Sequence, residues 1–134
     1  MAQDNLAVIR DHYAATNERD FTRALAYYDV DVELLVPPAY LQAGEFKGRD
    51  AVGAWFADRF SSFDRDAHFE VKELTELDDG AVLLVADCHA RGRKSGVELH
   101  DTVVWLYRFS HGKIARVERY ASRDEALGAT GLSG

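Results

Sequence analysis

The chain has 134 residues, 47% of them hydrophobic and 29% charged, a balance typical of one globular domain and not of a disordered or coiled-coil chain. Its 16 Lys and Arg residues against 23 Asp and Glu residues give a formal net charge of −7, which disfavours nucleic acid and anionic membrane surfaces as partners. Cys88 is the only cysteine, so an intrachain disulfide and a cysteine-based zinc cluster are excluded. With no signal-peptide pattern and no apolar run of membrane length, we expect a single cytoplasmic domain over residues 1–134.

The N-terminal part of the chain has the 3.6-residue periodicity of helices. Asp4, Asp20 and Asp50 are each placed to cap a helix. A short strand over residues 32–36, ended by two prolines, and a loop over residues 39–49 separate the second helix from the third. The predicted buried side of the first helix consists of Leu6, Ile9, Tyr13 and Thr16, with Val8, His12 and Ala15 beside it; that of the second consists of Phe21, Ala24, Leu25 and Tyr28.

From residue 68 onward the pattern changes to the two-residue alternation of strands. Four strands are expected, separated by three turn sequences that each contain glycine. They cover residues 69–77, 81–91, 97–109 and 113–122. Helices followed by an antiparallel meander predict an α+β fold, with the helices packed on one face of the sheet.

The register of the last hairpin decides which residues share a face of the sheet. A three-residue Ser-His-Gly loop would place Trp105 opposite Val117. The same loop would place Val103 opposite Arg119, so that Arg119 would lie diagonally from Asp101. A two-residue loop would instead turn the side chains of the last strand to the other face.

The hairpin before it is expected to pair Cys88 with Asp101 and His89 with His100 across a four-residue loop. Both faces of the long strand are then apolar in the middle, which requires helices on one side and another cover on the other. A second subunit on the convex face, giving a homodimer, is the predicted cover. The concave face would carry Leu99, Asp101, Val103, Trp105, Tyr107 and Phe109, and the convex face His100, Thr102, Val104, Leu106 and Arg108.

Several runs in the second half of the chain form a recognisable set: GRKSGVEL at 92–99, VWLYRF at 104–109, GKI at 112–114, Tyr120, DEAL at 124–127 and Gly131-Leu132. The set resembles the SnoaL-like proteins of the nuclear transport factor 2-like superfamily, over essentially the whole chain. This resemblance implies a cone-shaped curved antiparallel sheet wrapped around N-terminal helices, with an internal pocket and commonly a dimer. The superfamily includes ketosteroid isomerases, polyketide cyclases, dehydratases and epoxide hydrolases, so the resemblance implies the fold and not one reaction.

The catalytic positions of the ketosteroid isomerases are largely replaced in this chain. Their hydroxyl donor on the first helix falls on His12 or, one residue away, on Tyr13. Their general base falls on Val36 and their second acid on Trp105, neither of which can transfer a proton. The catalytic set of the limonene-type epoxide hydrolases is likewise absent. The resemblance therefore carries no intact catalytic set.

Three polar residues remain as candidate catalytic groups. Asp101 is the predicted proton carrier, because desolvation on an apolar concave face would raise its pKa. His12 would serve as a second donor or acceptor, and Arg119 as an electrostatic partner or oxyanion stabiliser. The alternative is that Asp101 is hydrated at the strand end or forms a structural ion pair with Arg119. The predicted substrate-binding wall consists of Tyr13, Val36, Cys88, Val103, Trp105, Tyr107 and Val117.

A metal site is conceivable at His89, His100 and Asp87, whose side chains are of the types that bind metals. Their spacing in the sequence matches no metal-binding motif, so neither a metal nor a cofactor is expected. The sequence predicts a small-molecule pocket protein whose ligand is mostly apolar. One hypothesis is a cofactor-independent acid–base enzyme, an isomerase, cyclase, dehydratase or hydrolase acting on a carbonyl- or hydroxyl-bearing substrate. The other is a non-catalytic ligand-binding or dimerisation module of the same fold.

Overall fold

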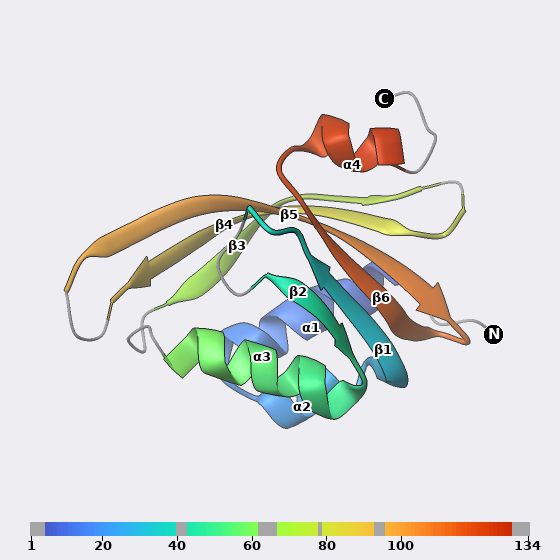
Figure 1. The fold of residues 1–134 in the computed structure, drawn as a ribbon, viewed down its shortest axis with the longest axis horizontal. Coiled ribbons are helices and arrows are strands. Elements are labelled where there is room, and N and C mark those ends of the chain that lie inside the picture. Colours follow the sequence, from blue (N-terminus) through green and yellow to red (C-terminus); the bar gives the residue numbers. More distant parts are fainter. Residues whose placement is uncertain (1–4, 40–42, 62–66, 78, 93–95, 130–134) are drawn as a thin grey trace.

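The structure is a computed structural model that describes residues 5–39, 43–61, 67–77, 79–92 and 96–129. A six-stranded curved sheet lies between two layers of helices, with α1, α2 and α3 on its concave face and α4 on its convex face (Figure 1). None of the described helices is long and apolar enough to cross a membrane. The helices are α1 (Asn5–Asn17), α2 (Phe21–Leu25), α3 (Arg49–Ser61) and α4 (Arg123–Ala129). The strands are β1 (Tyr28–Val36), β2 (Gly44–Lys47), β3 (His68–Glu76), β4 (Val82–Arg91), β5 (Glu98–Ser110) and β6 (Lys113–Tyr120).

The predicted α+β fold is confirmed, and the order of the strands is β2-β1-β6-β5-β4-β3. The last four strands form the expected antiparallel meander. The sheet is mixed rather than wholly antiparallel, because β1 pairs in parallel with β6. Parallel pairing is possible there because the whole chain between β1 and β6 forms the crossover connection.

The elements differ from the sequence-based prediction at four places. The first strand begins at Tyr28, so Tyr28 belongs to β1 and not to the second helix. Within the predicted loop over residues 39–49, residues 44–47 form β2, a short edge strand paired with the end of β1. The helix α4 was not predicted as an element. The predicted cap at Asp4 lies outside the described residues, and the third helix begins at Arg49, one residue before its predicted cap.

The cap of α2 is confirmed, because the Asp20 carboxylate accepts a hydrogen bond from the Arg23 backbone N–H at 3.1 Å. We expect Asp20→Ala to lower the free energy of unfolding by about 1 kcal/mol, since a helix of five residues depends strongly on its cap. Urea denaturation measures this change. Asp20→Asn is the matched control, because an asparagine side chain caps equally well; an equal loss in both variants would contradict a capping role.

The turn between β5 and β6 contains two residues, His111 and Gly112, both with positive φ angles of 52° and 78°. The predicted three-residue loop was therefore wrong. The shorter turn alone would direct the side chains of β6 to the opposite face of the sheet. A bulge at Ala115 adds one residue to β6 and returns them to the predicted face. Trp105 now lies opposite Arg119, two residues from the predicted register but on the predicted face.

The second hairpin agrees with the prediction, because Cys88 pairs with Asp101 and His89 with His100. The faces of β5 also follow the expected alternation. Side chains of β5 on the concave face enter the main core with α1 and α3, and those on the convex face enter a second cluster. The two faces of the long strand are therefore both buried in the middle, as the sequence indicated.

The apolar middle of the convex face is covered by the chain's own α4. Leu106 is fully buried and Val104 is 3% exposed in a cluster that includes Ala126 and Leu127 of α4. The sequence analysis assigned this cover to a partner subunit because it did not recognise the short C-terminal helix, and the homodimer itself stays a prediction. Thr102, the third residue named for that interface, lies at the exposed part of the strand.

Candidate functional site

His12 is a buried polar residue in the helical layer under the sheet, and only 4% of it is exposed. Its Nδ1 lies 3.3 Å from the carbonyl oxygen of Ala24, and its Nε2 lies 3.1 Å from the hydroxyl of Tyr28. A carbonyl oxygen only accepts hydrogen bonds, so Nδ1 carries the proton. Nε2 is then the acceptor, and the Tyr28 hydroxyl donates to it.

Burial sets the protonation state of this pair. Desolvation by burial is the largest cause and lowers the pKa of His12 to about 4, while the hydrogen bond to the Ala24 carbonyl and the charge of Asp11 act in the opposite direction. Burial also holds the pKa of Tyr28 well above its usual value. At neutral pH both groups are uncharged, so they can position a ligand through hydrogen bonds. A histidine with this pKa is poorly matched to carry protons near pH 7.

A second polar pair lies beside the first. The hydroxyl groups of Tyr13, on α1, and Tyr107, on β5, are hydrogen-bonded to each other in the core. The His12 ring lies edge-on to Tyr13 and Tyr28, with ring centroids 5.1 and 5.2 Å apart. The four side chains form one aromatic polar cluster, which we call the His12 cluster. Sequence analysis identified His12, Tyr13 and Tyr107 but missed Tyr28, which it placed in the second helix as a core residue.

A cavity of about 130 Å³ opens beside the His12 cluster. Its wall is apolar except for His12, Thr16 and Tyr28, and Thr16 donates its hydroxyl hydrogen to the His12 carbonyl. A cavity of about 150 Å³ with apolar walls accommodates a benzene-sized molecule, so this one fits a single small ring. The described residues that line it are His12, Thr16, Phe21, Ala24, Leu25, Tyr28, Gly53, Phe56 and Ala57.

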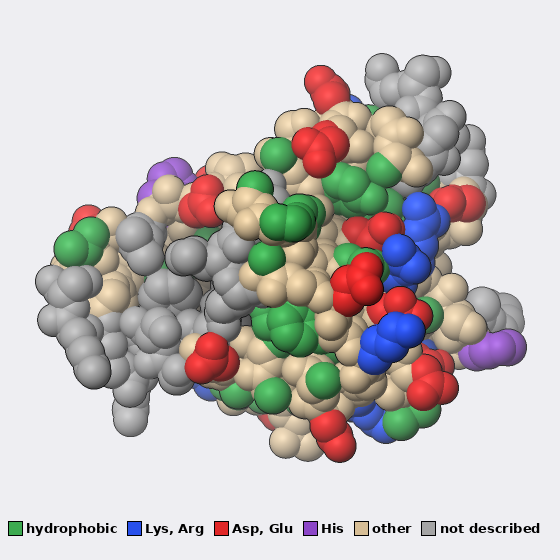
Figure 2. Space-filling model, viewed as in Figure 1, with side chains coloured by type: hydrophobic (Ala, Val, Ile, Leu, Met, Phe, Trp, Pro, Cys, Tyr) green, Lys and Arg blue, Asp and Glu red, His purple; other side chains and the backbone are tan. Residues whose placement is uncertain are grey.

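A larger cavity of about 590 Å³ lies where β1 and β6 end and β2 begins. Acidic and basic side chains gather over β1 and β6 (Figure 2), where Arg116 lies 4.0 Å from Glu33 and 3.5 Å from Glu118. Glu118 also lines the cavity. The described residues around it are Leu35, Val36, Pro37, Pro38, Ala43, Gly44, Glu45, Glu118, Arg119 and Tyr120.

Arg119 is the polar residue that links this larger cavity to the sheet core. It is 7% exposed, and its Nη1 donates a 2.7 Å hydrogen bond to the carbonyl of Tyr120. The guanidinium lies over the ring of Trp105, 5.6 Å from the ring centroid. Its Nη2 lies 3.9 Å from the carboxylate of Asp101, which is a loose ion pair. The predicted approach of Arg119 to Asp101 is therefore present.

Asp101 does not enter an apolar interior. Its side chain is 71% exposed, because it lies with the exposed His100 and Thr102 in the part of β5 that leads to the tip of the β4–β5 hairpin, before the buried run that starts at Val103. The expected desolvation of this carboxylate was therefore wrong. Asp101 is also six residues from Tyr107, roughly 20 Å along an extended strand. The structure brings Asp101 and Arg119 together but leaves His12 in a different place.

Most of the predicted substrate-binding wall is packed core. Val103, Trp105 and Val117 are buried in the main cluster, and Trp105 packs edge-on against Trp55 with ring centroids 6.2 Å apart. Cys88 is 8% exposed in β4. Val36 lines the larger cavity at the end of β1.

Comparisons with known proteins agree with this geometry. A family model described as a SnoaL-like domain matches residues 9–117. The chain is 26% identical over 116 residues to the uncharacterized protein Rv0034 of Mycobacterium tuberculosis, covering 87% of both chains. Solved structures with the same fold include proteins described as NTF2-like or as having a ketosteroid isomerase-like fold.

Two solved structures show the degree of structural similarity and sequence identity. Bal32a, from a soil-derived mobile gene cassette, has a TM-score of 0.79 and 23% identity, with 89% of each chain covered. Rv0760c of Mycobacterium tuberculosis, in complex with estradiol-17beta-hemisuccinate, has a TM-score of 0.73 and 18% identity, covering 90% of this chain and 95% of that one. Similarity at these identities shows the fold alone.

Proposed function

This chain belongs to the SnoaL-like family of the nuclear transport factor 2-like superfamily, and within that fold we propose that it binds a small, mostly apolar ring molecule carrying a hydroxyl group. The observation that carries the proposal is the cavity of about 130 Å³ whose apolar wall contains the hydrogen-bonded His12–Tyr28 pair. The rings of Phe21 and Phe56 would contact the apolar part of the ligand. The Tyr28 oxygen would accept a hydrogen bond from the ligand's hydroxyl group.

The direction of the hydrogen bonds favours a hydroxyl over a carbonyl on the ligand. The Tyr28 hydrogen is committed to His12 Nε2, so the Tyr28 oxygen is left as an acceptor. A ligand hydroxyl can donate to that oxygen without breaking the existing pair. A ligand carbonyl would need the Tyr28 hydrogen for itself, which would leave the buried Nε2 without a partner and cost about 1–3 kcal/mol.

A similar fold is known to accept a ring ligand, since Rv0760c forms a complex with estradiol-17beta-hemisuccinate. That ligand is much larger than the cavity beside His12. The comparison supports ligand binding by this fold as a class, and the size of the ligand follows from this chain's own cavity.

A second candidate function is acid–base catalysis at the other end of the sheet. It is favoured by the loose 3.9 Å contact between Asp101 and Arg119, a guanidinium that lines the larger cavity. An exposed carboxylate that is not locked into a bidentate pair can still exchange protons with a substrate. Asp101→Asn would abolish turnover of a substrate in this reading, and would leave phenol binding beside His12 unchanged.

Binding in the smaller cavity can be tested with phenol and toluene, which differ by a hydroxyl in place of a methyl group. Burying the phenol hydroxyl without a partner would cost about 1–3 kcal/mol, so an apolar cavity with no acceptor would favour toluene by about tenfold or more. We expect the acceptor on Tyr28 to offset this cost, so that phenol binds at least as tightly as toluene. An NMR titration of the labelled protein measures both affinities. A preference for toluene of about tenfold or more would contradict the role of Tyr28 as the acceptor.

Gly53→Ala locates the binding site. A Cβ at Gly53 would lie 2.9 Å from the Cδ1 of Leu25, which would have to move, and both residues line the cavity. We expect weaker phenol binding with little loss of stability, because alanine favours the helix by about 1 kcal/mol over glycine. Gly128→Ala is the matched control, since a Cβ there meets nothing within 4 Å. Equal phenol binding by both variants would place the ligand elsewhere.

A further inference from the structure

Three histidines form a row across the convex face, on the three strands at one edge of the sheet. His68 on β3 pairs with His89 on β4, which pairs with His100 on β5. The neighbouring rings are stacked, with centroids 5.0 and 4.5 Å apart and interplanar angles of 19° and 9°. His89 is half-buried and the other two are exposed, so their ring nitrogens are accessible from solvent.

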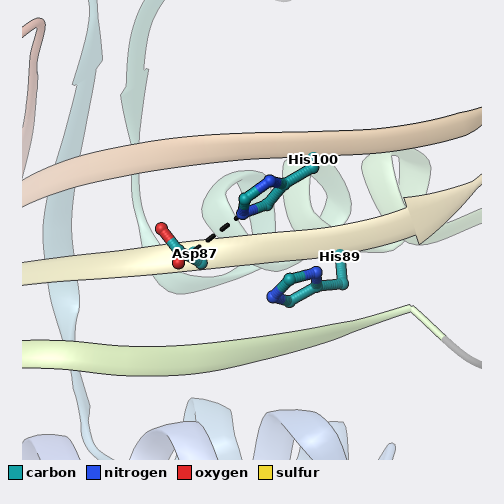
Figure 3. A group of neighbouring side chains, drawn as sticks. All are labelled: Asp87, His89 and His100. Atoms are coloured by element: carbon teal, nitrogen blue, oxygen red, sulfur yellow. Dashed lines mark ion pairs between the residues drawn. The ribbon is translucent and has the colours of Figure 1, made fainter.

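Carboxylates lie next to this row on the same face. Asp87 precedes His89 by two residues on β4, and its Oδ2 is 3.5 Å from the Nε2 of His100 (Figure 3). The Oε2 of Glu70 is 3.5 Å from the Nε2 of His89. One donor atom from each of Asp87, His89 and His100 lies within 4.8 Å of the other two. Two imidazole nitrogens and a carboxylate oxygen are thus close neighbours on the surface.

We propose that Asp87, His89 and His100 bind a late first-row divalent metal ion, and we take Zn²⁺ as the ion. Zn²⁺ takes histidine nitrogen and carboxylate oxygen as ligands at about 2.0–2.2 Å. In a tetrahedral site such ligands lie roughly 3.4 Å from one another. The rings of His89 and His100 are stacked, so they must turn about their side-chain bonds to direct one nitrogen each at the ion, which an exposed face permits. Water completes the coordination, or Glu70, whose Oε2 is 3.5 Å from His89 Nε2, supplies the fourth ligand.

The position of Asp87 is fixed in a way that suits a ligand. Thr102 on β5 donates its hydroxyl hydrogen to Asp87 Oδ1 at 2.9 Å, which leaves Oδ2 directed at His100. Hydrogen bonds of this kind orient metal ligands and are part of functioning sites. Cys88, between Asp87 and His89 in sequence, is buried on the other face by the alternation of the strand and is not a ligand.

Lys72 already supplies a positive charge to these carboxylates. Its Nζ lies 2.9 Å from Glu70 Oε1 and 3.7 Å from Asp87 Oδ2. A metal ion at the proposed position would be repelled by this ammonium group, so Lys72 must swing away when the ion binds. Removal of Lys72 therefore distinguishes two cases. If the carboxylate and the histidines bind a metal ion, the ion should bind more tightly without Lys72; if they form only an ionic network, the network should lose stability without it.

The site is separate from the cavity beside His12, since the two lie on opposite faces of the sheet. Sequence spacing gave no support for a metal because the ligands come from two strands, and their meeting depends on the pairing of His89 with His100. Binding of an ion here would link β4 to β5 at the exposed end of the hairpin. The proposal therefore stands or falls independently of the proposed function.

The test is a calorimetric titration of the full chain, without a polyhistidine tag, with Zn²⁺ at pH 7.5. We expect one equivalent to bind with micromolar affinity, and His89→Gln and His100→Gln each to weaken binding at least tenfold. Lys72→Met should tighten binding severalfold. The matched control is His111→Asn, another exposed histidine, at a turn whose positive φ asparagine tolerates; it should bind as the wild type does.

Co²⁺ in place of Zn²⁺ gives a second readout, because its visible absorption reports the ligand geometry. Intense tetrahedral bands in the wild type that disappear in His89→Gln/His100→Gln would support the site, provided that circular dichroism shows both proteins folded. Zn²⁺ affinity that is the same in the wild type and this double variant would overturn the proposal. Weaker binding by Lys72→Met would overturn it as well, since it would show an ionic network that needs the lysine.

Discussion

Replacing Leu106 by alanine is expected to lower the free energy of unfolding by about 2–5 kcal/mol. Leu106 is fully buried on the convex face of β5, in the cluster that α4 covers. The loss combines the transfer free energy of the removed carbons with the cavity left under a short helix. Urea denaturation followed by circular dichroism measures it. Val30→Ala on β1, where the valine is 61% exposed, is the control and should change stability by less than about 0.5 kcal/mol.

The same experiment decides what covers the convex face. If α4 is the cover, Leu127→Ala should also destabilise the protein, and the effects of Leu106→Ala and Leu127→Ala should be non-additive because both residues belong to one cluster. Sedimentation should show the same species for the wild type and both variants. A neutral Leu127→Ala, together with a change of assembly state in Leu106→Ala, would mean that a second copy of the chain covers this face instead.

The convex face of β5 shows what could and could not be predicted from the sequence. The alternation of β5 correctly indicated that Val104 and Leu106 needed cover. The cover itself was missed because α4 has only seven residues and contains Gly128, so its helical pattern is too short to stand out. Local periodicity identifies surfaces that must be buried, but it does not say which distant segment buries them.

The last strand gives a second example. The side chains of β6 point as predicted although the predicted turn was wrong, because the two-residue turn and the bulge at Ala115 compensate for each other. A bulge in the middle of a strand has no strong sequence signal. The predicted face was therefore correct, and the predicted neighbours across the ladder were wrong by two residues.

The candidate site was predicted in pieces. The helical periodicity placed His12 and Tyr13 on the buried side of α1, and the structure confirms this burial. Tyr28 was missed because the boundary between α2 and β1 lies three residues after the end of a very short helix. The burial of Asp101 was wrong because alternation predicts the face of a strand but not how far along that face the helices reach.

Stability should fall steeply between pH 6.5 and pH 4 because of His12, and this is the second large effect expected. The pKa of His12 is about 4 in the folded protein, since burial disfavours the imidazolium, and 6.5 is its ordinary value in an unfolded chain. Between these values the unfolded chain binds one more proton than the folded protein does. Lowering the pH therefore favours unfolding, and the total loss is about 3 kcal/mol.

The contribution of His12 is isolated by comparing the wild type with His12→Gln, which keeps a polar side chain but does not titrate. Above pH 7 the wild type should be the more stable of the two, since glutamine cannot reproduce both hydrogen bonds, to Ala24 and to Tyr28. This advantage should shrink by about 3 kcal/mol as the pH falls to 4, because the carboxylates that titrate in the same range are common to both proteins. His111→Asn, which removes an exposed histidine, should keep the wild-type slope. Parallel stability curves for the wild type and His12→Gln between pH 7 and pH 4 would show that His12 is not held neutral by burial, and would remove the basis for treating it as a neutral hydrogen-bond partner beside the cavity.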